Sequence, residues 1–465
     1  MQIEYPYDTS DLTGVTSVIP GCSSHSHEDP PPDPLSPLNI RISVFMDGTL
    51  NNLFNTHVGG GQYSGEHVSY RNTYSNVARM AMNLVTVCSA NTYHLPVYVQ
   101  GIGSLAGRPD SPDPDVGTGW GSTGVEARVI ACINHIRSRI QDLSRGNHVI
   151  QNLKIDAFGF SRGAAAARHF VHNVLQSGGT SLISTLRTND HFAITEYRMP
   201  FIGLYDTVAS FGVDRADDPL ELNLDAIRLA QVEKVVQLAA ADEHRFYFPL
   251  IDINSVPSPR GEQIFLPGAH SDIGGGYNNR DDGDRTEVNL DVFKIEEGTF
   301  GEKTNRIMQQ KRYLERRGWY EPSELQWNPE NPLSLVANRH HIGNQYSLVP
   351  LHIMKNKATV AELHFNLDDY PIPDWHDNLL GRIKTRIEDS RSDADTWLNA
   401  SDEQLVRLRH LNLHFSSRYN EFAHLVGYKH GPQFYTAASP GTPESWSENN
   451  GHTLNGVRKR RIYHG

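Results

Sequence analysis

The stretch Lys154–Ala167, with the sequence KIDAFGFSRGAAAA, decides the fold. The apolar run Leu153–Phe160 is typical of a buried strand, and the alanine-rich run Arg162–Leu175 is typical of a helix that packs closely on a sheet. Between them, Gly159–Gly163 fits the pattern G-x-S-x-G, in which a serine lies on a sharp strand-to-helix turn with its hydroxyl exposed. The stretch predicts Ser161 as a nucleophile, and the alternative is a tight turn with a structural role.

The segments on either side alternate between strand and helix patterns. The clearest helix has apolar residues spaced by three and four from Val125 to Leu143. Strands are expected at Ile40–Met46, Leu95–Val99 and Met199–Tyr205, with short ones at 245–250 and 263–266, and further helices at 72–87 and 222–241. Together with the serine motif, this alternation predicts an α/β-hydrolase fold with a mostly parallel central sheet wrapped by helices on both faces.

Composition divides the chain into three parts. Residues 1–37 are rich in proline and serine and have too little apolar surface to offset the entropy lost on ordering, which predicts a flexible leader. Residues 38–280 carry the alternating pattern and are expected to form the catalytic domain. Beyond residue 280 the pattern loosens, so 281–465 is expected to be an accessory or lid region packed on the core.

Charge and motif content exclude several classes of function. The 465 residues carry a formal net charge of −12, which disfavours nucleic acid as a partner. The first twenty residues contain no lysine, arginine or long apolar run, so no secretory signal is expected. No apolar run approaches the ~18 residues that a membrane-spanning helix needs. Motifs for zinc, calcium and nucleotide phosphates are missing, so we expect no metal and no other cofactor.

A serine hydroxyl needs a histidine base, and the histidine needs a carboxylate that orients it. Asp206 follows the strand pattern Met199–Tyr205, at the strand end where catalytic groups gather in open α/β folds. A helix cap is the alternative role for this aspartate. His270 lies in a glycine-rich loop after another predicted strand, which completes the hydrolase order Ser, Asp, His. Among the other histidines, His244 and His341 are reserve candidates for the base.

Two backbone amides must also face the oxyanion that forms during ester cleavage. The amide of Arg162, directly after the serine, is the first candidate. The second is expected from the loop after the strand Ile40–Met46, which contains Gly48 and Thr49.

The same loop has a competing interpretation. Asp47–Leu50, with the sequence DGTL, is also found in haloacid-dehalogenase-type phosphatases, where a nucleophilic aspartate lies two residues before such an aspartate. That position is Phe45 here, so the phosphoaspartate chemistry has no nucleophile.

Four ordered motifs resemble the catalytic domain of the type VI secretion lipase effectors, a bacterial family of α/β hydrolases that attack phospholipids of rival cells. They are FMDGT at 45–49, GFSRGA at 159–164, LYDTV at 204–208 and GAHSDIGGGY at 268–277. AADEHRF at 240–246 is also similar to a stretch of the family. The likeness spans residues 40–280, with a fainter echo at 346–352.

The resemblance implies a Ser-His-Asp phospholipase, of phospholipase A type, with catalytic roles for Ser161, Asp206 and His270. It implies a phospholipid membrane as substrate, and an immunity protein and a secretion-apparatus spike protein as partners. It also implies a protein that is cytoplasmic in the producing bacterium and is then secreted without a signal peptide into the target-cell periplasm, with peripheral membrane contact.

Two further questions stay open at the level of sequence. The basic stretches Lys303–Arg317 and Arg458–Arg461 could meet anionic lipid headgroups, or they could be a solvated helix face and tail. The alternatives to a phospholipase are a soluble carboxylesterase with the same triad and a vestigial hydrolase fold that serves as an interaction protein.

Overall fold

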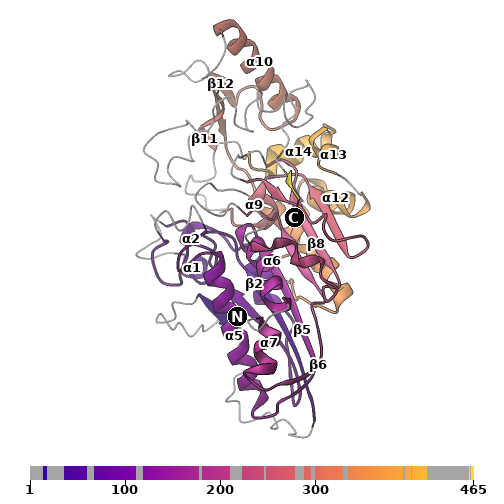
Figure 1. Cartoon of the computed structure of the whole chain (residues 1–465). Coiled ribbons are helices and arrows are strands. Elements are labelled where there is room, and N and C mark those ends of the chain that lie inside the picture. Colours follow the sequence, from indigo (N-terminus) through magenta and orange to yellow (C-terminus); the bar gives the residue numbers. More distant parts are fainter. Residues whose placement is uncertain are drawn as a thin grey trace.

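A nine-stranded sheet forms the centre of the molecule (Figure 1). The computed structural model describes residues 14–17, 36–59, 67–111, 119–176, 181–209, 222–243, 245, 248–277, 287–294, 299–327, 334–390, 393–399, 401–415, 460 and 462–464. Its main path has the order β1-β4-β2-β5-β7-β8-β10, with β3 beside β4 and β6 beside β5. All of these neighbours pair in parallel except β1 and β3, which are antiparallel to β4. The predicted, mostly parallel α/β sheet is confirmed.

The strands of this sheet are β1 (Val15–Ser17), β2 (Leu38–Met46), β3 (Val87–Ser89), β4 (Thr92–Val99), β5 (Val149–Phe160), β6 (Ala193–Arg198), β7 (Ile202–Tyr205), β8 (Val235–Ala240) and β10 (Gly261–Leu266). Two smaller sheets contain β11 (Glu287–Lys294), β12 (Leu325–Trp327) and β13 (Ser334–Arg339), and β9 (Leu250–Ile251) with β14 (Ile462–Tyr463).

The helices are α1 (Leu53–Val58), α2 (Val68–Arg71), α3 (Asn76–Asn83), α5 (Val125–Ser144), α6 (Arg162–Leu175), α7 (Leu182–Thr188), α9 (His270–Gly274), α10 (Phe300–Arg316), α11 (Leu348–Ala358), α12 (Trp375–Asp389), α13 (Ala394–Asn399) and α14 (Glu403–Asn412), with short 3₁₀ turns at Leu224–Arg228, Gln345–Ser347 and Thr359–Ala361.

Helices cover both faces of the sheet, and strand β2 shows why. Its residues at even positions from Ile40 to Met46 share one hydrophobic core with α5, α6 and α7, which lie together in Figure 1. Phe45 faces the other way and stacks on Phe158 in a second core with α3 and α11. Because successive strand residues point to opposite faces, a strand buried on both sides is apolar along most of its length.

The expected helix at 222–241 is wrong. Its second half is the fully buried strand β8, which pairs with β7 on one side and β10 on the other. A short, continuous apolar run does not distinguish a buried helix from a buried strand, and the two adjacent valines at 235 and 236 favour the strand.

The predicted boundaries at residues 37 and 280 do not divide the core. Val15–Ser17, within the predicted flexible leader, form the edge strand β1, where Val15 packs into the core with α5. Residues 1–13 and 18–35 of that leader lie outside the described residues. On the other side, α11 packs against β8 and α3, so part of the predicted accessory region covers the sheet itself.

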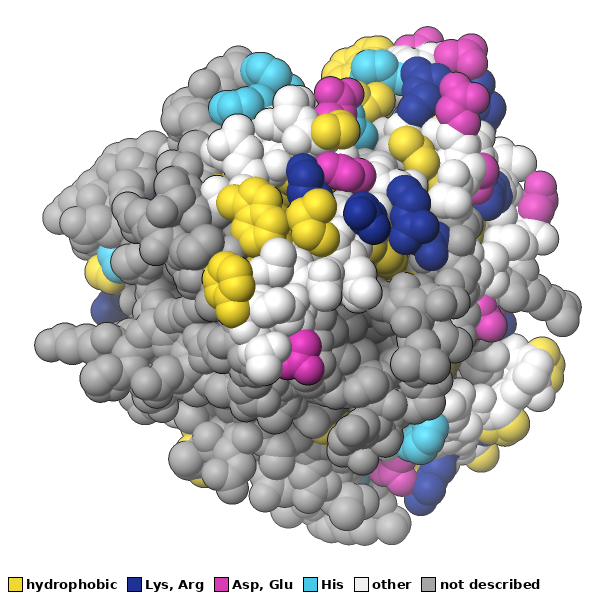
Figure 2. All heavy atoms as spheres, turned by 90° about the horizontal axis from the view of Figure 1, so that it is seen from above, with side chains coloured by type: hydrophobic (Ala, Val, Ile, Leu, Met, Phe, Trp, Pro, Cys, Tyr) yellow, Lys and Arg dark blue, Asp and Glu magenta, His cyan; other side chains and the backbone are white. Residues whose placement is uncertain are grey.

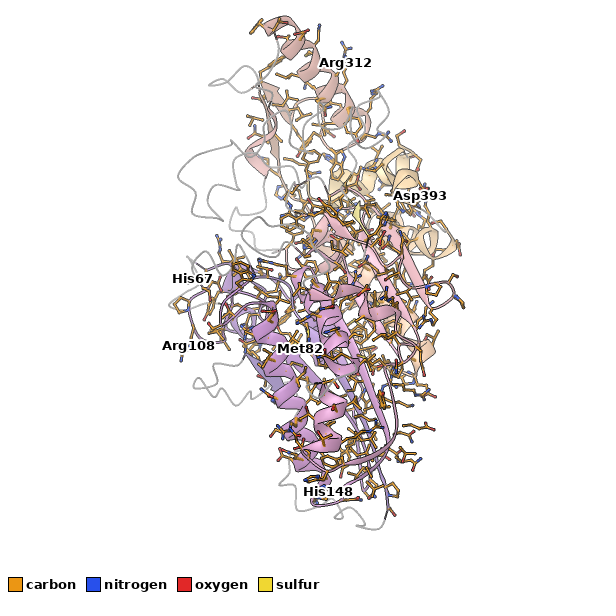
Figure 3. The ribbon with its side chains drawn as sticks, in the orientation of Figure 1. His67, Met82, Arg108, His148, Arg312 and Asp393 are labelled. Atoms are coloured by element: carbon orange, nitrogen blue, oxygen red, sulfur yellow. The ribbon has the colours of Figure 1, made fainter. Side chains whose placement is uncertain are left out.

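Helix α10, with β11 and β12, forms the end of the molecule farthest from the start of β5. Figure 3 shows Arg312 of α10 at this end and His148, directly before β5, at the opposite end. Seen from above, hydrophobic, basic and acidic side chains lie close together on one part of this face (Figure 2). Phe300 at the start of α10 is 70% exposed. Within the described part of the chain, no helix has the length and apolarity to span a bilayer.

Candidate active site

Ser161 lies on the turn between β5 and α6, where the sequence predicted it. Its backbone has φ 59° and ψ −129°, a strained conformation for a residue with a side chain. The turn is held by its N–H, which donates to the carbonyl of Tyr205 at 3.0 Å. Its hydroxyl makes no capping hydrogen bond to α6. The strain therefore places a hydroxyl that helix capping does not use at the carboxyl end of the sheet.

The two glycines of the motif allow backbone approaches that any side chain would block. A Cβ at Gly159 would lie 2.4 Å from the carbonyl oxygen of Gly163. A Cβ at Gly163 would lie 2.2 Å from the carbonyl oxygen of Asp47, in the loop after β2. The second glycine thus lets the start of α6 approach the loop that was predicted to supply an oxyanion amide.

Asp206 follows β7 and is fully buried. Its Oδ1 accepts a hydrogen bond of 2.8 Å from the amide of Ala240, and its Oδ2 lies 2.5 Å from Nδ1 of His270. Since a carboxylate only accepts, Nδ1 of His270 carries the proton, which leaves Nε2 as the basic nitrogen. The Asp206 side chain therefore binds Ala240 and His270 and does not cap a helix.

His270 begins the short helix α9 and lies between two aromatic rings. The ring centroid of Phe160 is 4.6 Å away and that of Phe248 is 5.0 Å away. The backbone N–H of His270 donates to Oε2 of Glu243 at 3.2 Å. Glu243 is in turn held by Arg245 at 2.9 Å. Rings and hydrogen bonds together fix the orientation of the imidazole.

The electrostatic setting favours a neutral histidine beside an ionised aspartate. Burial lowers the pKa of His270, and this outweighs the opposite effect of the hydrogen bond to Asp206. For Asp206, burial acts to raise the pKa, but the charge of Arg460 and the hydrogen bond from His270 prevail, so the pKa lies below its ordinary value. A neutral imidazole can accept a proton at neutral pH, as a general base must.

Contacts of the Ser161 backbone and of the preceding residue place Ser161 beside the Asp206–His270 pair. Its carbonyl accepts from the amide of Val208, two residues after Asp206, at 3.4 Å, and the ring of Phe160 packs on His270. Among the contacts of the described residues, no hydrogen bond joins the Ser161 hydroxyl to His270. Catalytic hydrogen bonds are often long before substrate binds, so the geometry is compatible with a base that closes on the serine.

In the loop after β2, the two predicted oxyanion residues differ in the hydrogen bonding of their backbone amides. The amide of Gly48 donates to Oδ1 of Asp47 at 2.8 Å, so it is already engaged. In the described part of the chain, the amide of Thr49 has no such partner, and its hydroxyl accepts from Nε of Arg162 at 2.8 Å. Thr49 is thus the better candidate of the two, and its link to Arg162 joins both halves of the proposed oxyanion hole.

Asp47 organises this loop. Its carboxylate accepts from the hydroxyls of Ser75 and Tyr98, each at 2.6 Å, in addition to the Gly48 amide. Burial raises its pKa to about 6, against the opposing effect of these hydrogen bonds. The Asp47 carboxylate therefore fixes the loop through these three hydrogen bonds.

Of the reserve histidines, His244 lies outside the described residues, and His341 is exposed. Arg460 donates a hydrogen bond to Asp206 across 254 positions of sequence, and no motif marks it as a site residue. Arg460 was instead grouped with a basic stretch expected to meet lipid or solvent, and this expectation is wrong for Arg460, whose side chain is 4% exposed. The other residues of that stretch lie outside the described residues.

A second cluster of the same residue types lies within the sheet. The hydroxyl of Ser43 donates to Oδ2 of Asp156 at 3.0 Å and lies 2.9 Å from Nε2 of His94. Arg41 binds Asp156 through two nitrogens, at 2.7 and 2.9 Å. All four side chains are buried on strands β2, β4 and β5.

Metal ligands are not gathered at either cluster. Within the described residues, no group of three or more histidine, cysteine, aspartate or glutamate side chains is arranged to hold a metal ion.

Comparison with known proteins identifies a related family. The model of the type VI secretion system phospholipase effector Tle1-like catalytic domain matches residues 180–293, a range that includes Asp206 and His270 and begins after Ser161. The predicted resemblance to the type VI secretion lipase effectors is confirmed by this match together with a structural one. A search of curated proteins finds no match.

The structural match is to a Tle1 effector bound to the VgrG spike from the type 6 secretion system. It has a TM-score of 0.55 and 21% sequence identity, and it covers 87% of this chain and 90% of the other. An uncharacterized protein from Pseudomonas aeruginosa matches with a TM-score of 0.40 and 16% identity, over 80% of this chain and 52% of the other. At these identities, the first likeness shows a shared fold.

Proposed function

We propose that the chain is a serine hydrolase that cleaves acyl ester bonds of glycerophospholipids, a phospholipase of A type. The observation that carries the proposal is the buried hydrogen bond of 2.5 Å between Asp206 and His270, beside a strained serine at the same edge of the sheet. The match to a phospholipase effector domain over residues 180–293 supports phospholipid as the substrate class.

In the proposed mechanism, Oγ of Ser161 attacks the acyl carbonyl while Nε2 of His270 takes its proton. Asp206 keeps the proton of His270 on Nδ1 and stabilises the imidazolium that forms. The amides of Arg162 and Thr49 hold the oxyanion of the tetrahedral intermediate. The imidazolium then protonates the leaving alcohol, and water activated by the same histidine releases the fatty acid from Ser161.

The test is the release of fatty acid from phospholipid vesicles by the wild-type protein and by Ser161→Ala. Loss of the nucleophile is expected to lower the rate on the order of 10⁴-fold or more. Equal rates would reject the mechanism. Mass spectrometry of the lysophospholipid product identifies which ester is cut, and a preference for short soluble esters over vesicles would favour the carboxylesterase alternative.

A phosphonate probe separates an enzyme from an interaction protein with a vestigial site. The probe labels a serine only where the nucleophile is activated. We expect labelling of the wild-type protein and none of Ser161→Ala. A wild-type protein that resists the probe and releases no fatty acid would support the vestigial alternative.

We further propose an antibacterial role as a type VI secretion effector that acts in the target-cell periplasm and contacts the membrane peripherally. The exposed Phe300, with the exposed Arg312 and Arg316 on the same helix, supports contact with an anionic lipid surface. The structural relative bound to a VgrG spike suggests a spike protein as the delivery partner. The test compares growth of bacteria that express the protein in the periplasm or in the cytoplasm, with Ser161→Ala as control and an immunity protein expected to restore growth.

A further inference from the structure

Arg460 and Ile462–His464 lie at the sheet edge where the proposed triad lies, and these four residues are called the returning segment. Strand β14 pairs in parallel with β9, with Ile462 opposite Leu250 and Tyr463 opposite Ile251. The amide of Asp252 donates to the carbonyl of Tyr463 at 2.9 Å, and Nδ1 of His464 lies 2.8 Å from Oδ2 of Asp252. These contacts fix the segment beside the residues that follow Phe248.

Arg460 reaches from this segment to Asp206. Its Nη1 donates to Oδ1 of Asp206, and its Nε donates to the carbonyl of Phe248 at 2.7 Å. Nη1 also lies 3.4 Å from the carbonyl of Ala240. Oδ1 of Asp206 is therefore held by Arg460 and the Ala240 amide, and Oδ2 is left to His270.

Fixing one oxygen of a carboxylate sets the direction of the other. A buried aspartate with only the Ala240 amide on Oδ1 could rotate away from His270 or take up a proton, because burial penalises its charge. A guanidinium keeps its charge at any pH relevant here and is planar, so it favours one orientation of the carboxylate. The same group also touches the carbonyl of Phe248, whose ring packs on His270.

We propose that Arg460 is a positioning residue, and that the returning segment completes the active site by holding Arg460 against Asp206. The inference rests on the proposed function, because it assigns Arg460 a role through the carboxylate of the proposed triad. It predicts that catalysis depends on a side chain outside residues 180–293, the range that matches the effector catalytic-domain model.

The pH dependence of kcat/KM distinguishes a positioning role of Arg460 from a purely structural one, because only positioning predicts the direction in which the acidic limb moves. The charged groups facing the Asp206–His270 pair are Arg460, Arg245 and Glu243. Removing the positive charge of Arg460 makes the pair bind a proton at higher pH, whichever member takes it. The active form has no such proton, so the acidic limb of kcat/KM moves to higher pH, by about one unit or more for an opposite charge in direct contact.

The experiment compares Arg460→Met, Arg460→Lys and the wild-type protein in fatty acid release and in phosphonate labelling of Ser161 across pH. For Arg460→Met, we expect kcat at pH 7 to fall about tenfold to a hundredfold, because Asp206 loses the group that fixes its direction toward His270. The loss should be smaller at high pH, where the shift of the acidic limb no longer adds to it. Lysine keeps the charge but not the planar fork, so Arg460→Lys should recover part of the activity and have an acidic limb near that of the wild type.

Arg198→Met is the matched control, since it removes an exposed arginine at the end of β6 that pairs with Glu233. It should leave both the rate and the pH profile unchanged. If Arg460→Met keeps the wild-type rate and acidic limb while Ser161→Ala is inactive, the inference fails and the proposed function stands. If Ser161→Ala is as active as the wild type, the proposed function fails.

A structural role for Arg460 is tested in the same series. Thermal unfolding of each variant separates loss of the fold from loss of catalysis. If Arg460→Met does not fold, the kcat of Arg460→Lys decides, because a wild-type kcat with lysine in place would overturn the need for a planar guanidinium. Partial rescue of Arg460→Met by added methylguanidinium would support positioning of Asp206, and a lower unfolding temperature with an unshifted acidic limb would overturn it.

Discussion

Ser43, His94 and Asp156 lie in the middle of three paired strands, whereas Ser161, Asp206 and His270 lie where the strands end. In the first cluster, the Ser43 hydroxyl donates its only hydrogen bond to Asp156. The contact with His94 must therefore be donated by Nε2 of His94 to the serine oxygen. A histidine with its proton on that nitrogen cannot act as a base toward the serine. In the second cluster, Asp206 accepts a hydrogen bond from the protonated Nδ1 of His270, which leaves Nε2 basic.

The two clusters also differ in backbone and access. Ser43 is an ordinary strand residue opposite Pro96 and Asp156, with a fully buried side chain. Ser161 has a positive φ on a turn beside two glycines. The residue types alone therefore do not make the proposed site; the direction of one hydrogen bond and the position relative to the strand ends distinguish the two clusters.

The largest expected difference between the clusters follows from removing each serine hydroxyl. Ser161→Ala should lower fatty acid release on the order of 10⁴-fold or more, whereas Ser43→Ala should keep the rate per folded molecule. Ser43→Ala should instead destabilise the fold by about 1–3 kcal/mol, because buried groups of His94 and Asp156 lose a partner. Initial rates and thermal unfolding check both, and comparable rate losses would contradict the distinction.

The aspartates should differ in the same direction. Asp206→Asn is expected to lower kcat about 10³-fold or more, since an amide no longer fixes the tautomer of His270. Asp156→Asn leaves the charge of Arg41 buried without its partner, so it should cost about 3–5 kcal/mol of stability and little activity per folded molecule. Urea unfolding and active-site titration with the phosphonate separate the two effects. A stable but inactive Asp156→Asn variant would contradict the structural role assigned to Asp156.

The two histidines should respond to different pH ranges. Burial lowers the pKa of His270 from its ordinary value of about 6.5, so activity should persist through neutral pH and fall as pH drops through that lowered pKa. Burial, with the charge of Arg41, lowers the pKa of His94 to about 3. The stability that the neutral His94 provides is therefore full above about pH 6.5 and is lost as pH falls toward 3. Rate profiles and unfolding curves at several pH values check this, and an activity that rises on acidification would contradict it.

The smallest expected effect concerns the proposed oxyanion loop. Thr49→Val removes the hydroxyl that accepts from Arg162 but keeps the amide, so kcat should fall about tenfold, less than for loss of a whole oxyanion donor. Thr49→Ser keeps the hydroxyl and serves as control. Equal kcat for the valine and serine variants would show that the link to Arg162 does not position the loop.

The sequence was informative where the determining contacts are local. The serine turn could be predicted because its strand, two glycines and alanine-rich helix are contiguous, and α6 has the expected bounds Arg162–Leu175. Strand β8 was mistaken for part of a helix because a continuous apolar run has no period. The edge strand β1 was missed because Val15–Ser17 is short and lies in a segment of polar composition.

The candidate site could be predicted only as far as chain order and motif allow. Asp206 and His270 were chosen by their places after strands, and the hydrogen bond between them fits that choice. Arg460 could not be chosen, because 254 positions separate it from Asp206 and its neighbours in sequence look like a basic tail. The engagement of the Gly48 amide by Asp47 depends on backbone geometry, which no residue pattern reports.

The contact between Arg460 and Asp206 also depends on the order in which the residues of the chain are synthesised. A ribosome makes the serine turn, the aspartate and the histidine long before it makes residue 460, so a nascent chain holding the first three still lacks the guanidinium that fixes the carboxylate. If catalysis depends on that contact as proposed, a growing chain can reach its full rate only after synthesis has passed this arginine.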